Sequence, residues 1–98
     1  MSVHEYIKDI KCLVSFTRNS EALTLLQHLA SLVKPIMSKR GWKVKRLKEF
    51  FPKNPSLLGL NINRGSEIRI RLRPASDKTV FLDCNDLIGT LLHEYASC

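Results

Sequence analysis

Residues 58–73 read LGLNINRGSEIRIRLR, two alternating segments that flank the turn Asn63-Arg64-Gly65. A period of two is typical of β-strands, and Gly65 stands where a hairpin loop with a bulge needs a left-handed backbone. The stretch therefore predicts two antiparallel strands of a sheet with one apolar and one polar face. The first strand alternates Leu58, Leu60 and Ile62 with Gly59, Asn61 and Asn63, and the second alternates Ile68, Ile70 and Leu72 with Glu67, Arg69, Arg71 and Arg73.

Further extended segments precede this hairpin. Trp42-Lys43-Val44-Lys45 alternates apolar residues with lysines, and it is followed by a predicted loop at Phe50-Phe51-Pro52. The alternation of apolar residues between Ile10 and Phe16 allows one more short strand. We therefore expect an antiparallel sheet of three to four strands.

Two helices are expected around the sheet. The first spans about residues 20–40, with Ser20 as its cap, Pro35 bending its last turns and Gly41 ending it. Its apolar stripe consists of Ala22, Leu25, Leu26, Leu29, Val33, Ile36 and Met37. The second helix follows Asp83 as its cap and buries Leu87, Ile88, Leu91, Leu92 and Tyr95. Helix, strands and helix in this order predict an α+β fold.

The charge of the chain is unevenly distributed. The 98 residues carry a net charge of +7, and residues 34–73 hold 12 lysines and arginines against 2 carboxylates. Such a cationic region favours a polyanion partner such as nucleic acid. No apolar run suits a membrane span, and no signal peptide begins the chain, so we expect no membrane association. Three unevenly spaced cysteines favour reduced thiols in cytosol or nucleus.

The residues that carry chemistry are His93 and Glu94 on the second predicted helix. They occupy the first two positions of the HExxH pattern, in which two histidines one helical turn apart bind zinc and the Glu activates water. Ser97 stands at the position of the second histidine. Among the remaining ligand candidates, we expect a surface or boundary role for His28 and a packing role for Cys84. Cys98 stands about 140° around the helix from His93 at a fraying terminus, and His4 precedes any predicted element.

Several strings occur in one order along the chain: KPIM (34–37), LLGLNINRG (57–65), IRLR (70–73), FL (81–82) and GTLLHE (89–94). Together they resemble the WLM family of zinc metalloproteases, relatives of the SprT and Spartan proteases that digest proteins crosslinked to DNA. The resemblance implies the opening portion of a minimal zincin fold, with a long helix on an antiparallel sheet and the His-Glu helix beneath it. It also implies His93 as the first zinc ligand and Glu94 as the catalytic general base.

The resemblance covers residues 20–94 and then fails, because the family continues with a second and a third ligand histidine where this chain has YASC (95–98). We therefore expect an N-terminal extension (1–19) and a truncated metalloprotease domain (20–98). Zinc binding should be weak or absent, which leaves open whether this chain is an enzyme. The alternatives are a non-catalytic basic module that binds nucleic acid and a fragment without a function of its own.

The family implies further expectations about partners. These are DNA, DNA-bound or SUMO-modified proteins, and a nuclear location with the cytoplasm as a further compartment. Strands lying side by side would gather five cations on one sheet face, a candidate nucleic-acid surface that could equally be an ordinary solvated face. The five are Lys43, Lys45, Arg69, Arg71 and Arg73.

Overall fold

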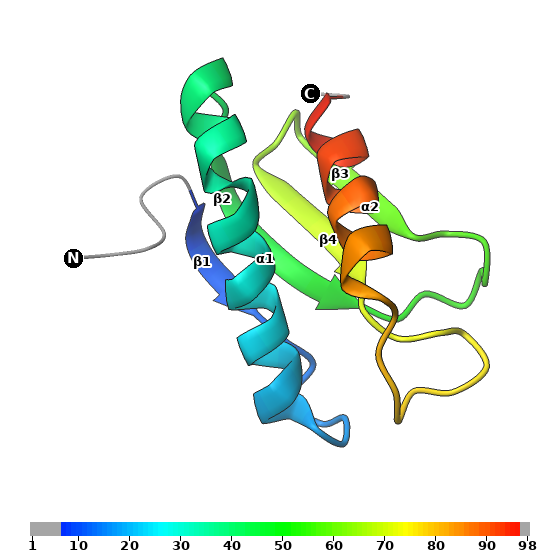
Figure 1. The fold of residues 1–98 in the computed structure, drawn as a ribbon. Coiled ribbons are helices and arrows are strands. Elements are labelled where there is room, and N and C mark those ends of the chain that lie inside the picture. The colour runs from blue at the N-terminus through cyan, green and yellow to red at the C-terminus, as the bar shows by residue number, and fades with distance from the viewer. Residues whose placement is uncertain (1–6, 97–98) are drawn as a thin grey trace.

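The computed structural model describes residues 7–96, which form one sheet covered on one face by two helices (Figure 1). The elements in chain order are β1 (Ile7–Lys11), α1 (Asn19–Arg40), β2 (Val44–Phe50), β3 (Gly59–Ile62), β4 (Glu67–Arg71) and α2 (Cys84–Ala96). Helix α1 packs on β1 and β2, and α2 packs on β3 and β4, side by side with α1. The α+β class expected from the sequence is confirmed. No helix in the described range is long and apolar enough to span a bilayer.

The sheet has the order β1-β2-β4-β3 and is mixed. The predicted hairpin is confirmed, since β3 and β4 pair antiparallel with Leu60 opposite Arg69. The expectation of an antiparallel sheet throughout is wrong, because β1 pairs with β2 and β2 with β4 in parallel. For β1 and β2 the physical reason is the connection, because α1 crosses back over the sheet between them and such crossovers join parallel strands. For β2 and β4 the reason is that β3, which lies between them in the chain and is antiparallel to β4, takes the edge of the sheet.

Two strand boundaries also differ from the expectation. The first strand is Ile7–Lys11 and not the later segment from Ile10 to Phe16, and it places Ile7 beside Val44. Strand β2 continues through Lys48 to Phe50, so Phe50 belongs to the sheet and not to the loop. Parallel pairing with β4 supports this extension, because it pairs Phe50 with Arg71.

The structure confirms two of the three helix ends that were predicted from the sequence. Gly41 ends α1 in the left-handed region, at φ 68°, where glycine has no steric penalty. Ser20 is not the N-cap of α1, because that position is held by Arg18 without a side-chain cap hydrogen bond. Asp83 does cap α2, with its Oδ2 accepting from the amide of Asn85 at 3.0 Å.

The core lies between the helices and the inner face of the sheet. It joins one stripe of each helix to alternate residues of the strands, as the periodicities predict. Its fully buried members include Leu26, Leu29, Val33 and Met37 of α1, Leu47 of β2, Ile68 and Ile70 of β4, and Leu87 and Leu91 of α2.

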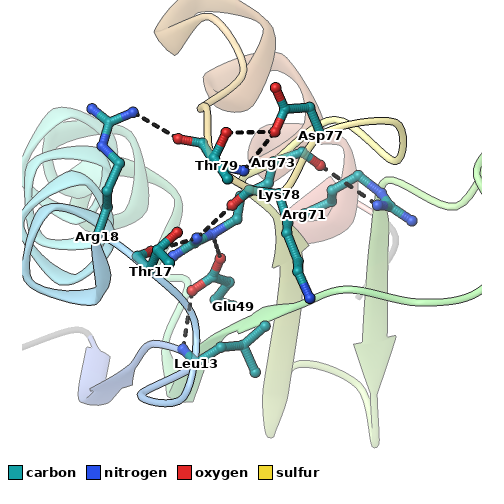
Figure 2. Close-up of polar contacts among 9 residues, drawn as sticks. All are labelled: Leu13, Thr17, Arg18, Glu49, Arg71, Arg73, Asp77, Lys78 and Thr79. Carbon is teal, nitrogen blue, oxygen red and sulfur yellow. Dashed lines mark hydrogen bonds and ion pairs between the residues drawn. The ribbon is translucent and has the colours of Figure 1, made fainter.

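A buried ion pair beside this core connects three distant segments (Figure 2). Arg73 is fully buried, and its Nε donates to Glu49 Oε2 at 2.7 Å. Its Nη1 donates to the carbonyls of Thr17 at 2.6 Å and Lys78 at 2.7 Å. The other carboxylate oxygen, Glu49 Oε1, accepts from the amide of Leu13 at 3.0 Å. The pair thus holds the loops before α1 and before α2 against β2.

Arg71 does the same for the loop that leads into β3. Its side chain is 1% exposed, and Nη2 donates to the carbonyls of Pro52 at 2.9 Å and Asn54 at 3.1 Å. Its Nε donates to the carbonyl of Leu57 at 3.1 Å. Arg71 therefore fixes the start of the edge strand β3 relative to β4.

Candidate functional site

The buried apolar stripe of α2 determines the directions in which the side chains of His93 and Glu94 face. Leu87 and Leu91 face the sheet and are buried, and Glu94 follows on the same helical face, where it is half-buried. His93 lies one residue away around the helix and is exposed. The pair thus stands on the last turn of α2, with the carboxylate toward β3 and the imidazole toward solvent.

Gly59 of β3 makes room for this carboxylate. A Cβ atom added at Gly59 would lie 2.8 Å from Glu94 Cγ and 3.0 Å from Glu94 Oε2. A methyl group at position 59 would therefore have to displace the Glu94 side chain, and glycine leaves the space that this side chain occupies.

Asn61, two residues along β3, ties the end of α2 to the hairpin turn. Its Nδ2 donates to the carbonyl of Glu94 at 2.8 Å, and its Oδ1 accepts from the amide of Gly65 at 2.7 Å. A half-buried amide thereby satisfies one backbone group at a helix C-terminus, where carbonyls lack helical partners. The sequence analysis did not identify this role, although a polar residue inside the LLGLNINRG string was a signal for it.

A groove of about 450 Å³ runs between β3 and α2. The loop before β3 forms one wall and the solvent-facing side of α2 the other. It is lined by Ser56, Leu57, Leu58, Gly59, Gly89, Thr90, His93 and Glu94. The His-Glu pair therefore lies in a concave site that opens to solvent.

The other ligand candidates lie elsewhere. His28 and Cys84 line a separate apolar hollow between α1 and the start of α2, at the opposite end of α2 from His93. His4, Ser97 and Cys98 lie outside the described residues. Between residues 7 and 96, no group of three or more His, Cys, Asp or Glu side chains is placed to hold a metal ion.

The five cations of the expected nucleic-acid surface do not form one exposed face. Arg71 and Arg73 are buried, because the loops 51–58 and 74–82 fold over their side chains and supply carbonyl partners. Arg69 donates to Glu67 Oε2 at 2.6 Å. Lys43 and Lys45 are exposed at the start of β2, where they line a different hollow with Lys8 and Arg64. The sequence analysis missed Lys8 and Arg64, because the place of Lys8 depends on the parallel pairing of β1 with β2 and that of Arg64 on the parallel pairing of β2 with β4.

Comparisons with known proteins define the class. The chain is 38% identical over 89 residues to the DNA-dependent metalloprotease WSS1 of Saccharomyces cerevisiae, a match that covers 91% of this chain and 33% of that protein. The crystal structure of Wss1 from S. cerevisiae matches with a TM-score of 0.93 and 37% identity, over 94% of this chain and 72% of that one. Wss1 from S. pombe matches with a TM-score of 0.80 and 32% identity, over 97% and 76%. The chain is thus homologous to a DNA-dependent metalloprotease.

A model of the WLM domain matches residues 5–98, a range that includes β1. The chain therefore belongs to the WLM domain family. It spans a third of the curated relative that it matches, and 72 to 80% of the solved Wss1 chains.

Membership of a metalloprotease family implies a metal cofactor, and the described residues meet that requirement in part. Zinc sites in proteins use three or four protein ligands. The groove offers one imidazole, His93, beside one carboxylate, Glu94. The described part of the chain therefore does not fit a complete metal site by itself.

Proposed function

We propose that this chain supplies the first part of the catalytic domain of a DNA-dependent zinc endopeptidase that acts on proteins crosslinked to DNA. In this proposal His93 is the first zinc ligand and Glu94 the general base. The observation that carries it is the position of the pair in the groove between α2 and β3. Family membership supports the reaction class, because a relative with 38% identity is a DNA-dependent metalloprotease.

Glu94 is suited to proton transfer in this position. Its carboxylate is half-buried and lies against Gly59, within a groove that opens to solvent. A positioned carboxylate of this kind can take a proton from a water molecule and return it to a leaving amine. The bond from Asn61 to the Glu94 carbonyl fixes the backbone from which this side chain projects.

We further propose that the remaining zinc ligands come from outside residues 7–96, so that residues 7–96 are inactive by themselves. The family resemblance supports a nuclear site of action, with the cytoplasm as a further compartment, and SUMO-modified proteins on DNA as partners. The share of the curated relative that this chain covers, 33%, leaves room there for such partner-binding segments.

The experiment adds the missing part of the site. The family continuation, through its second and third histidines, is joined after Glu94, and cleavage of a DNA-bound protein substrate is measured with and without DNA. We expect DNA-stimulated, chelator-sensitive proteolysis that disappears with Glu94→Gln, while the unextended chain stays inactive. Activity that persists in Glu94→Gln would contradict the role of this residue.

A second candidate is a non-catalytic basic module that binds nucleic acid. The net charge of +7 favours it, together with the incomplete ligand set of the described residues. The transcript sequence that follows the Glu94 codon separates the two candidates. An in-frame second histidine supports the protease, and a stop after the present sequence supports the module.

A further inference from the structure

The sheet carries a cationic hollow at the end where β1 and β2 begin. It has a volume of about 330 Å³ and lies on the outer rim of the hairpin turn. Its lining consists of Lys8, Lys43, Val44, Lys45, Asn63, Arg64, Gly65 and Ser66. Four of these eight residues are cations and none is a carboxylate, so the hollow is suited to an anion.

The topology explains why these cations meet. Parallel strands begin at the same end of a sheet, so Lys8 on β1 lies next to Lys43 and Lys45 at the start of β2. The turn before β4 reaches the same end because β2 and β4 are also parallel. In that turn Asn63 and Arg64 have φ values of 53° and 54°, in the left-handed region, and Gly65 has 91°.

The charges in the hollow are not neutralised within the described residues. The neighbouring cations of the sheet, Arg46, Lys48 and Arg69, share the carboxylate of Glu67 at distances of 2.6 to 3.4 Å. In contrast, Lys8, Lys43, Lys45 and Arg64 form no ion pair with any residue between positions 7 and 96. Uncompensated cations on a concave surface raise the local potential and attract an anionic ligand.

We propose that this hollow, defined by Lys8, Lys43, Lys45 and Arg64, binds the phosphate backbone of DNA. This proposal rests on the DNA dependence in the proposed function, and it identifies the surface of the chain that contacts the DNA. Lysines contribute point charges to phosphates, and the guanidinium of Arg64 can engage one phosphate with two N–H groups. No aromatic side chain lines the hollow, so binding depends on phosphates and not on stacked bases.

The hollow lies near the last turn of α2, which carries the His-Glu pair. Asn61 connects them, because its side chain binds both the amide of Gly65, which lines the hollow, and the carbonyl of Glu94. DNA seated on the turn would thus lie close to the groove in which a DNA-bound protein would be cleaved.

The test measures binding of labelled single- and double-stranded oligonucleotides to the 98-residue chain by fluorescence anisotropy, over a series of salt concentrations. The variant K43Q/K45Q/R64Q removes three cations of the hollow. The matched control K11Q/K53Q/K78Q removes three cations at the other end of the sheet, where β1, β2 and β4 end. Both triples change the net charge equally, and circular dichroism checks that each is folded.

We expect the hollow triple to reduce the slope of log affinity against log salt by about 2 to 3, since each lost phosphate contact is worth about 0.7 to 0.9. The control should keep the slope of the original chain. The single variants K43Q and R64Q should each reduce the slope in the same direction, which keeps the test valid if the triple is unstable. Equal losses in both triples, or no DNA binding by the original chain at low salt, would overturn the proposal.

This assay separates the two proposals because it involves no proteolysis. Binding that depends on the hollow, together with an extended chain that cleaves nothing, would refute only the proposed function. Proteolysis by the extended chain with equal binding losses in both triples would refute only the hollow.

Discussion

Two glycines on opposite walls of the groove have different surroundings, and this allows a matched test of the approach between α2 and β3. Gly59→Ala brings a methyl group to 2.8 Å from Glu94 Cγ, whereas a Cβ at Gly89 meets nothing within 4 Å. We expect Gly59→Ala to lower the free energy of unfolding by about 1 to 3 kcal/mol through overpacking. Gly89→Ala should raise it by about 0.5 to 1 kcal/mol, because alanine favours a helix over glycine.

Urea unfolding of both variants measures the difference. Gly89→Ala, on α2, is the control for the addition of a methyl group to this groove. If Gly59→Ala were as stable as Gly89→Ala, the packing of the Glu94 side chain against Gly59 would contribute nothing measurable to stability.

Glu67 is the titrating group whose surroundings give a clear pH dependence. The hydrogen bond from Arg69 lowers the pKa of this carboxyl below its ordinary value of 4.5, with a further lowering by the charge of Lys48 and an opposing effect of burial. A carboxyl with a lowered pKa stabilises the fold above its unfolded pKa, and this contribution is lost as the pH falls through the folded pKa.

We therefore expect Glu67→Gln to lower the free energy of unfolding by about 1 kcal/mol at pH 7, since the cations around it are partly exposed. The difference from the original chain should shrink as the pH falls below 4.5. Thermal unfolding at pH 7 and pH 3 measures it. A difference that grew toward low pH would contradict the lowered pKa.

At the scale of elements, Asn61 joins the hairpin to the end of α2, and its two bonds can be broken separately. Asn61→Asp keeps an acceptor for the Gly65 amide but replaces the donor to the Glu94 carbonyl with a second oxygen. We expect a loss of about 1 to 3 kcal/mol in stability, since a half-buried carbonyl loses its partner and faces a negative charge. Hydrogen exchange should then be faster in the last turn of α2 than in α1. Uniform protection of both helices would contradict this coupling.

The hairpin also shows which structural features the alternation of residues can predict and which it cannot. It predicted the strands and their pairing, and Ile68, Ile70 and Leu72 are fully buried as expected. In β3 the polar and small residues face α2 instead, and Leu60 remains 37% exposed. A period of two divides the residues of a strand between two faces of the sheet. Which of the two faces of β3 is covered depends here on α2, whose Glu94 lies 33 residues from Asn61 in the chain.

The positions of Arg71, at the end of β4, and Arg73, just beyond it, were predicted wrongly for a related reason. Alternation placed Arg71 and Arg73 on a solvated face, and their carbonyl partners lie in loops whose positions no local pattern predicts. The helix that carries His93 and Glu94, by contrast, was predicted correctly from its apolar stripe, because a helical pattern is local in sequence.

At the scale of the whole molecule, the Glu49–Arg73 pair connects both loops that lead into the helices (Figure 2). Both side chains are fully buried. Removing one partner leaves an uncompensated buried charge, so Glu49→Leu or Arg73→Met alone should cost about 3 to 5 kcal/mol. The double variant Glu49→Leu/Arg73→Met removes both charges and should be less destabilised than the two single losses together.

Thermal unfolding of this double-mutant cycle measures the coupling. A domain of this size has about 5 to 15 kcal/mol of total stability, so each single variant should melt far below the original chain. Additive losses in the double variant would mean that the two side chains do not stabilise the fold as a pair.

The response of the whole fold to zinc tests how complete the metal site is. A ligand that binds only the native state stabilises it by RT ln(1 + [L]/Kd), about 2.7 kcal/mol when its concentration is 100 times the Kd. The groove offers one imidazole and one carboxylate, and no group of three ligands exists within residues 7–96. At 100 µM, a metal ion bound with a Kd of about 1 µM would add about 2.7 kcal/mol to the unfolding free energy. Because two ligands alone hold zinc far more weakly, we expect 100 µM Zn²⁺ to add under about 0.5 kcal/mol for the 98-residue chain. His93→Ala should change this small effect little. Stabilisation above about 2 kcal/mol that His93→Ala abolishes would mean that further ligands complete a site around His93, and that this chain is a metalloprotein without any added segment.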